Sequence, residues 1–238
     1  MVFRGLIAGF IVISLQAGVC QAKGSVTWPD CRKAEASMGP SGDIYINGVR
    51  VGRNASGFRT NCVGDVAWIS RDGNIYLNEE QLGSGVSLDY KIAPFAHVVA
   101  WSGAGGSMNK NRSRLGSGVS TFDIAPYTGT IAWKTAAGEI YKDSEWVGYN
   151  ANSYSLSDYG VLAWSSADGN MYKDLERLGR NAGSFRISAT SGDVVWLDTG
   201  FNLHRNSLRI AAGVNSFDLD QDGRILWTDM SGMSHTAE

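Results

Sequence analysis

The stretch "DGNIYLNEEQLG" at residues 72–83 returns at residues 168–179 as "DGNMYKDLERLG", 96 residues further along the chain. Such self-similarity indicates a chain built from repeated units, and the period of the repeat decides the architecture. Six of the eight tryptophans obey one period, with separations of 33, 32, 31, 32 and 31 residues. The series is Trp68, Trp101, Trp133, Trp164, Trp196 and Trp227. The quoted stretches are therefore the middle of a unit of about 32 residues, three units apart.

Each unit has the pattern of four short β-strands. In "VAW" and "NIYLN" apolar or aromatic residues alternate with others, Gly-containing turns such as "RDG" separate the runs, and no window sustains a helical period. A second aromatic series is Tyr45, Tyr76, Asn109, Tyr141, Tyr172 and His204, and a third is Phe58, Tyr90, Phe122, Tyr154, Phe185 and Phe217. Four strands in about 32 residues predict a tight antiparallel meander.

Two further series predict turn positions. Only Gly and Asn adopt a left-handed backbone at low cost, so their interchange at one position indicates a residue with φ > 0. This series is Asn54, Gly85, Gly118, Asn150, Asn181 and Gly213. Asn and Asp also cap their own backbone in turns, which predicts a turn at Asn47, Asn78, Asn111, Asp143, Asp174 and Asn206.

The two ends of the repeat predict the closure of the fold. The chain enters in the middle of a unit at "GDIYINGVRVG", residues 42–52, and the last tryptophan strand, "RILWTDM", lacks most of its partner strands. Together the fragments make one unit, which predicts an all-β, six-bladed β-propeller over residues 42–238, closed by pairing of its N- and C-terminal strands. A β-prism or an open β-solenoid is the alternative. A β-trefoil would group its hairpins into three larger units, and the Asn/Gly series shows no such doubling.

The N-terminal segment predicts export. Residues 1–22 combine Arg4, an apolar run and a small-residue exit at Ala22, as a secretory signal peptide does. A lipid anchor at Cys20 is the alternative. Cleavage after Ala22 leaves an N-terminal extension, residues 23–41, and two cysteines, Cys31 and Cys62, which we expect to form a disulfide in a secreted or periplasmic monomer.

Charge and histidine content argue against several classes of function. The formal net charge is −2 and no basic run occurs, so we expect neither nucleic-acid binding nor membrane insertion. His97, His204 and His235 lie in no zinc-protease or hydrolase motif, and no acidic residue recurs in the tryptophan strands. The sequence therefore predicts no cofactor and favours a binding protein, although a propeller glycosidase or lyase stays a second alternative.

The acidic stretch "DLDQDG", residues 218–223, imitates the start of a calcium loop. Asp218, Asp220 and Asp222 would supply ligands, with Asp229 at the twelfth position. A calcium loop folds back on itself, whereas residues 224–229 align with an extended tryptophan strand. A solvated turn is therefore the preferred interpretation.

Arginine recurs just before the "LG" element, at Arg50, Arg114, Arg177 and Arg209. The guanidinium groups could grip carboxylates or sulfates, or their stems could simply pack over neighbouring aromatic rings. The third unit, "SMNKNRSRLG", loses the recurrent tyrosine and gathers Lys110, Arg112 and Arg114. If the protein binds an anion or a protein partner, we expect the contact there.

The repeated aromatic residues suggest carbohydrate binding. Trp presents a flat apolar face with one polar tip, which suits the face of a sugar ring, and several similar weak sites bind a repetitive polysaccharide by avidity. The candidate residues are Trp68, Trp101, Trp133, Trp164, Trp196 and Trp227, although these six could equally fill the space between blades. Trp146 stands outside the period, so the packing explanation does not apply to it.

The segment "RLGRNAGSFRISATSGDVVW", residues 177–196, resembles the repeat units of propeller lectins of the tachylectin and tectonin type. The resemblance extends over about residues 42–232 and implies sugar binding between blades. The sequence thus predicts an exported, non-catalytic binding module with carbohydrate as its ligand. A scaffold that binds a protein through the face of the propeller is the first alternative.

Overall fold

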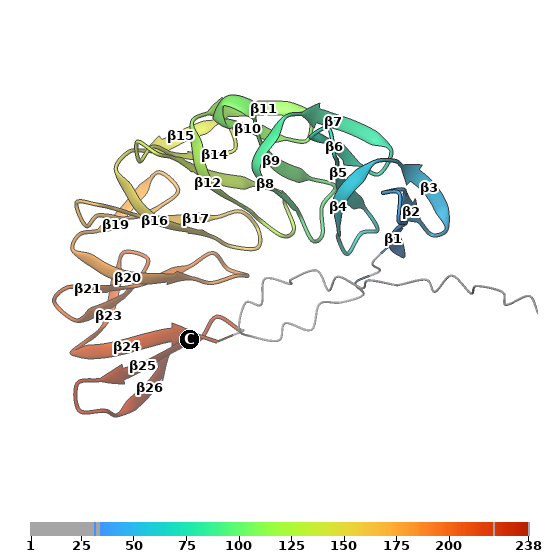
Figure 1. Ribbon diagram of the computed structural model, residues 1–238. Coiled ribbons are helices and arrows are strands. Elements are labelled where there is room, and N and C mark those ends of the chain that lie inside the picture. Colours follow the sequence, from blue (N-terminus) through green and yellow to red (C-terminus); the bar gives the residue numbers. More distant parts are fainter. Residues whose placement is uncertain (1–30, 32–33, 221, 238) are drawn as a thin grey trace, which may run out of the picture.

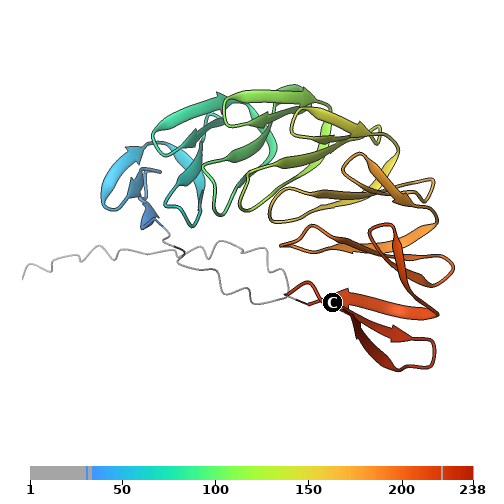
Figure 2. The same ribbon diagram turned by 180° about the vertical axis from the view of Figure 1, so that it is seen from behind.

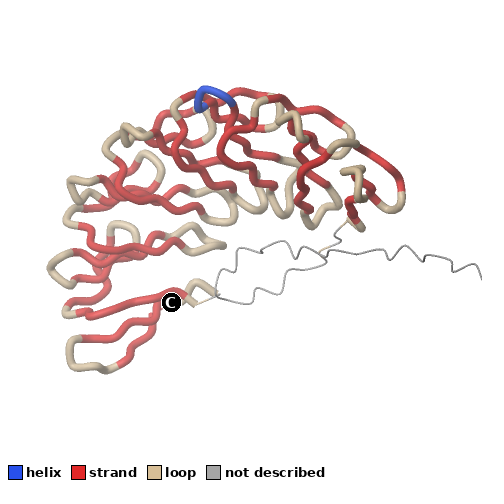
Figure 3. The backbone as a smooth tube through the Cα atoms, viewed as in Figure 1, coloured by secondary structure: helices blue, strands red, loops and turns tan. Residues whose placement is uncertain are grey.

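The computed structural model describes residue 31, residues 34–220 and residues 222–237, and consists almost entirely of short strands (Figure 3). The predicted signal peptide and the alternative anchor at Cys20 lie outside the described residues. The described strands form seven antiparallel sheets, five of four strands and two of three. One 3₁₀ turn, η1 (Ala104–Gly106), interrupts them, and no helix among the described residues is long and apolar enough to cross a membrane.

The strands follow the repeat from end to end. The first sheets contain β1 (Ala36–Met38), β2 (Ile44–Ile46) and β3 (Val49–Gly52); β4 (Ala55–Thr60), β5 (Val66–Ser70), β6 (Asn74–Leu77) and β7 (Glu80–Ser84); and β8 (Val86–Ile92), β9 (Val99–Gly103), β10 (Ser107–Lys110) and β11 (Ser113–Ser117). The middle sheets contain β12 (Val119–Ile124), β13 (Ile131–Thr135), β14 (Ile140–Lys142) and β15 (Glu145–Gly148); and β16 (Ala151–Leu156), β17 (Leu162–Ser166), β18 (Met171–Lys173) and β19 (Glu176–Gly179). The last sheets contain β20 (Ala182–Ile187), β21 (Val194–Asp198), β22 (Asn202–Arg205) and β23 (Leu208–Ala212); and β24 (Val214–Leu219), β25 (Ile225–Asp229) and β26 (Ser234–Ala237). The predicted all-β class and four-stranded antiparallel blade are confirmed.

The tryptophan of each complete sheet packs against a glycine of the preceding sheet. Trp133 on β13 stacks on Tyr141, with ring centroids 4.1 Å apart, and its other side meets Gly116 on β11. A Cβ atom at Gly116 would lie 2.5 Å from the indole, so only glycine fits there. The same contact joins Gly52 to Trp68, Gly83 to Trp101, Gly148 to Trp164, and Gly179 to Trp196. The glycine of the "LG" element is thus fixed by inter-sheet packing.

The predicted turn residues lie in turns, and each of them from Asn78 onward accepts a hydrogen bond through its side chain and another through its backbone carbonyl. Asn78 has φ of 54°, accepts the Val66 N–H through Oδ1 at 2.9 Å, and accepts the Trp68 indole N–H through its carbonyl at 2.7 Å. Positive φ also occurs at Asn47, Asn111, Asp143, Asp174 and Asn206, and in the other series at Asn54, Gly85, Gly118, Asn150, Asn181 and Gly213. The predicted left-handed series is therefore confirmed, and the residues of the predicted turn series have positive φ as well.

The loops between the first and second strands link successive sheets along the inside of an arc (Figure 1). Backbone N–H groups donate to carbonyls of the next loop, from Cys62 to Pro94, Phe95 to Pro126, Tyr127 to Asp158, and Asp158 to Ala189, at 2.8–3.1 Å. The rings of Phe95, Tyr127 and Tyr159 stack along the same line, with centroids 4.6 and 5.0 Å apart. This ladder satisfies loop backbone groups and fixes the spacing of the sheets.

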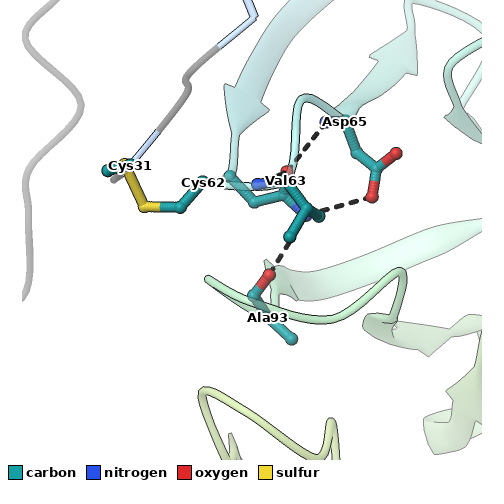
Figure 4. The surroundings of a disulfide bond; sticks show 6 residues. Cys31, Cys62, Val63, Asp65 and Ala93 are labelled. Carbon is teal, nitrogen blue, oxygen red and sulfur yellow. Dashed lines mark hydrogen bonds between the residues drawn. A yellow bond between two sulfur atoms is a disulfide. The ribbon is translucent and has the colours of Figure 1, made fainter. Parts of the chain in front are cut away.

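The predicted disulfide is present between Cys31 and Cys62, whose Cα atoms are 4.4 Å apart (Figure 4). It fixes residue 31 to the loop between β4 and β5. The Asn61 side chain holds that loop by donating to Asp65 at 3.0 Å and to the Ala93 carbonyl at 3.2 Å. The N-terminal extension is thus fixed to the body of the array, as the cysteine count predicts.

The two ends of the chain do not pair as the closed ring requires. The sheets lie along an arc with the first and last at its two ends (Figures 1 and 2), and these two are separate sheets among the described residues. β1 comes from the predicted extension and lies beside β2, where the prediction places the Trp227 strand. Its Ser37 pairs with Tyr45, just as Trp68 pairs with Tyr76 in the next sheet. The predicted pairing of the N- and C-terminal strands is therefore wrong, and the two ends of the described chain form separate sheets.

The outer face of the last sheet gives the physical reason. Val195 and Leu203 of the preceding sheet are buried against β24 and β25. The equivalent residues of the last sheet are Leu226, which is 41% exposed, and Ser234, which is exposed. Of the two apolar positions, the last sheet keeps leucine at one and has serine at the other, so it offers less apolar surface for packing than Val195 and Leu203 do.

Candidate functional site

The repeat tryptophans belong to the core. Trp68, Trp101, Trp133, Trp164 and Trp196 are 3, 6, 1, 3 and 2% exposed, respectively. All five contact the glycine of the preceding sheet, and four of them, all except Trp101, also stack on a ring of their own sheet. Asn109 replaces that ring beside Trp101. No open face is left for a ligand, so the structure favours packing over sugar contact for these five.

Trp227 and Trp146 differ from the other tryptophans. Trp227 lies in the last sheet, is partly exposed, and stacks on His235 at a longer centroid distance of 5.4 Å. Trp146, on the edge strand β15, is 50% exposed beside Tyr149, which is 68% exposed. The Trp146 and Tyr149 rings have centroids 6.5 Å apart and planes inclined by 12°. The two rings are nearly parallel, and both are open to solvent.

The three basic residues of the third unit are not gathered into one anion site. Lys110 pairs with Asp143 of the following sheet at 3.1 Å, and Arg112 pairs with Glu80 of the preceding sheet at 2.7 Å. Arg114 stays exposed on β11 and donates to the Gly116 carbonyl at 3.4 Å. Lys110 and Arg112 therefore join neighbouring sheets, and Arg114 is the one of the three that forms no ion pair among the described residues.

The acidic stretch folds as a turn. Asp220 Oδ1 accepts the backbone N–H groups of Asp222 and Arg224, both at 2.9 Å, and Asp218 lies 3.7 Å from Arg186. Asp229 is used in its own turn, where it accepts the Ser231 hydroxyl at 2.6 Å. Within the described ranges, no three histidine, cysteine or acidic side chains are placed to share a metal ion. The geometry favours the solvated turn over the calcium loop.

Each histidine has a carboxylate partner. His97 Nδ1 lies 2.7 Å from Asp65 Oδ2, His204 Nε2 3.1 Å from Asp198, and His235 Nε2 2.8 Å from Asp229. His204 also takes the place of the stacked tyrosine, 4.1 Å from the Trp196 ring. The geometry therefore gives each histidine a local structural contact.

Asp198 gives a pH-dependent prediction. Burial alone would raise the pKa of its carboxyl, but hydrogen bonds from Asn202, His204 and Gly200 outweigh burial and hold the pKa below the usual value. A depressed folded pKa stabilises the fold above the unfolded pKa, and this contribution is lost as the pH falls below about 4. Asp198→Asn should therefore lower the free energy of unfolding at pH 6, by a margin that narrows below about pH 4.

Urea titrations of Asp198→Asn and the native protein between pH 3 and pH 7 measure this margin. Asp222→Asn, at an exposed carboxyl, is the matched control and should leave the free energy of unfolding unchanged at every pH. If the difference in unfolding free energy between Asp198→Asn and the native protein stays constant down to pH 3, the pKa of Asp198 is not lowered in the folded protein.

A cleft of about 530 Å³ lies between the sheet of β16–β19 and the sheet of β20–β23. Its walls come mainly from β16 and β20, the first strands of the two sheets, and from the end of β17. The polar and aromatic residues along the walls are Asn152, Ser153, Tyr154, Ser165, Ser184 and Phe185. Phe185 packs into the gap, on the same side as the Ser153 and Ser165 hydroxyls, whereas Tyr154 turns toward the preceding sheet, where its hydroxyl donates to Thr121 Oγ1 at 3.3 Å.

Departures from the repeat explain why the cleft opens at this interface. Ser165 follows Trp164, at the position held by Ile69, Lys134 and Leu197 in three other sheets and by a second serine, Ser102, after Trp101. Lys134 fills the corresponding space at the preceding interface, where its Nζ donates to the carbonyls of Ala151 and Asn152 at 3.4 and 3.2 Å. Across the cleft, Gly183 on β20 has no side chain. Two small residues therefore leave space that longer ones occupy elsewhere.

The polar groups of the cleft can exchange partners. Ser153 Oγ and Ser165 Oγ lie 2.8 Å apart, and either can donate. A hydroxyl is both donor and acceptor, so this pair can rotate to meet a ligand hydroxyl. Arg186, at the mouth, is exposed and lies 3.7 Å from Asp218. This cleft could not be predicted from the sequence, because it results from the small size of Ser165 and Gly183 rather than from a motif.

Comparison with known proteins identifies neither a family nor an activity for this chain. No protein-family model matches the sequence, and no curated protein matches it significantly. Among solved structures, the WD40 β-propeller domain of Doa1 is 12% identical with a TM-score of 0.31, covering 84% of this chain and 88% of that chain. The Dos1 propeller is 11% identical with a TM-score of 0.33, covering 84% and 72%, respectively. At these scores the likeness carries no argument about ligand or partner.

Proposed function

We propose that the protein is an exported, non-catalytic module that binds carbohydrate in the cleft between β16 and β20. The observation that carries the proposal is the chemistry of the walls: the hydroxyls of Ser153 and Ser165 lie in the same inter-sheet gap as the ring of Phe185. Sugars display hydroxyls around their rim and C–H groups on their faces, so a site for them combines rotating hydrogen-bond partners with aromatic surface.

The volume and position of the cleft support this ligand class. About 530 Å³ lies within the range of small-ligand sites and has room for one or two sugar rings. An inter-sheet position is also what the resemblance to tachylectin and tectonin lectins implies. Export is supported by the signal-like residues 1–22 and by the Cys31–Cys62 disulfide, a bond typical of oxidising compartments.

A protein-binding scaffold centred on the third unit has less support. Lys110 and Arg112, the cations expected to make that contact, are engaged by Asp143 and Glu80. A partner would have to break these ion pairs, which would offset part of the free energy of binding.

The test fills the cleft with a larger side chain that occurs naturally at the same position of another sheet. Ser165→Ile introduces the side chain that Ile69 places after Trp68 in the second sheet, so the fold should accept it. A glycan array first identifies a saccharide that the native protein binds without cleavage. We expect Ser165→Ile to weaken that binding at least about tenfold, because lost hydroxyl partners and lost volume act together.

Thr228→Ile is the matched control. Thr228 occupies the position of Ser165 in the last sheet, which faces no further sheet. Its substitution should leave saccharide affinity unchanged. An array with no hit, or a hit that Ser165→Ile binds as tightly as the native protein, would refute the proposal.

A further inference from the structure

The fourth strands of the sheets present one row of side chains on the outer edge of the array, here called the outer row. Its members lie opposite the third-strand residue that occupies the tyrosine position, so they share one register and occur once per sheet. They are Arg50, Gln81, Arg114, Trp146, Arg177 and Arg209. Because packed sheets lie about 10 Å apart, neighbouring members of the row are spaced by about that distance.

The middle of the outer row combines an aromatic surface with guanidinium groups. The Trp146–Tyr149 pair lies between Arg114 of the preceding sheet and Arg177 of the following sheet. Arg180 occupies in the following sheet the position that Tyr149 holds in its own, three residues after the row member. The exposed aromatic pair is therefore flanked by positively charged residues along the direction of the row.

These arginines lack acidic partners within the part of the chain that the structure describes. Arg177 and Arg180 are exposed and make no ion pair there, in contrast to Lys110 and Arg112, which do. Glu176 precedes Arg177 but, as its neighbour in a strand, points to the opposite face. Exposed, unpaired guanidinium groups are free to grip carboxylate or sulfate groups through two parallel N–H donors.

We propose that the outer row binds a linear acidic polysaccharide. One sugar ring lies on the Trp146–Tyr149 surface, and carboxylate or sulfate groups of neighbouring sugars meet Arg114 on one side and Arg177 and Arg180 on the other. The regular spacing of the row suits a polymer rather than a single small anion, and the flat rings favour a sugar chain over an acidic peptide. This site is separate from the cleft and takes charged rather than neutral sugars.

The experiment measures binding of two charged probes, tetragalacturonate for carboxylate and a heparin tetrasaccharide for sulfate, with cellotetraose and a glutamate decapeptide for comparison. We expect the native protein to bind at least one charged saccharide more tightly than cellotetraose or the peptide, and to lose most of the affinity at 0.5 M NaCl. Trp146→Ala should weaken binding about tenfold, and Arg180→Gln about fivefold.

Arg53→Gln is the matched control, since Arg53 holds the same position as Arg180 but lies three sheets from the aromatic pair. That distance is about 30 Å along the row, so its removal should not weaken binding of a tetrasaccharide. Ser165→Ile should also bind the charged probe normally, which separates this proposal from the cleft. No binding of either charged saccharide, equal binding of the peptide, or an equal effect of Arg53→Gln and Arg180→Gln would overturn the inference.

Discussion

Replacing Trp133 by alanine should lower the free energy of unfolding by about 3–5 kcal/mol. Trp133 is 1% exposed, fills the gap between two sheets, and donates its indole N–H to the Asp143 carbonyl at 2.7 Å. Its removal leaves both a large cavity and a carbonyl without its partner. Urea unfolding followed by far-ultraviolet circular dichroism measures the loss.

Trp146→Ala is the matched control for Trp133→Ala, because both tryptophans belong to the same sheet and lose the same atoms. Trp146 is 50% exposed, and its removal should cost less than about 1 kcal/mol. A similar loss for both variants would contradict the assignment of the repeat tryptophans to the core.

Gly148→Val should lower the free energy of unfolding by about 3 kcal/mol. A Cβ atom at Gly148 would lie 2.5 Å from the Trp164 ring. That ring cannot retreat, because it is 3% exposed and stacks on Tyr172 with centroids 4.0 Å apart. Thermal and urea unfolding of the variant measure the cost of this overlap.

Gly57→Val separates the steric effect from the general cost of replacing a strand glycine. Gly57 lies on β4 with no neighbouring atom within 4 Å of an added Cβ, so its substitution should change stability by less than about 1 kcal/mol. Equal losses at Gly57 and Gly148 would show that close packing of tryptophan on glycine is not what holds the sheets together.

The last repeat contains a natural version of the same substitution. Ala211 replaces the glycine that faces the tryptophan of the next sheet. There Trp227 is partly exposed and lies 5.4 Å from the stacked His235, compared with 3.9 Å between Trp68 and Tyr76. The methyl group of Ala211 thus coincides with looser stacking of Trp227 on His235, in the last sheet, which no further described sheet covers.

The blade could be predicted from the sequence because its determinants recur. Trp133 and its equivalents define the period, and the Asn/Gly interchange identifies left-handed residues such as Asn150 and Gly118, with φ of 58° and 81°. Each signal is local and appears several times, so a chance match in one unit does not matter. The blade, the turns and the disulfide followed from these patterns.

The ends and the site could not be predicted in the same way. The strand Ala36–Met38 carries no tryptophan and therefore has no repeat signature. The prediction consequently gives its place beside β2 to the Trp227 strand, from the other end of the chain. The cleft depends on what Ser165 and Gly183 lack, and a missing side chain gives a pattern search nothing to find. Lys110 and Arg112 resembled an anion site because their partners, Asp143 and Glu80, lie in other repeats.

A crystal structure of the native protein with the best neutral saccharide from the array tests the central claim most directly. We expect one or two sugar rings between β16 and β20, with hydroxyls hydrogen-bonded to Ser153 or Ser165 and a ring face against Phe185. A saccharide bound only elsewhere, with this cleft unchanged, would contradict the account.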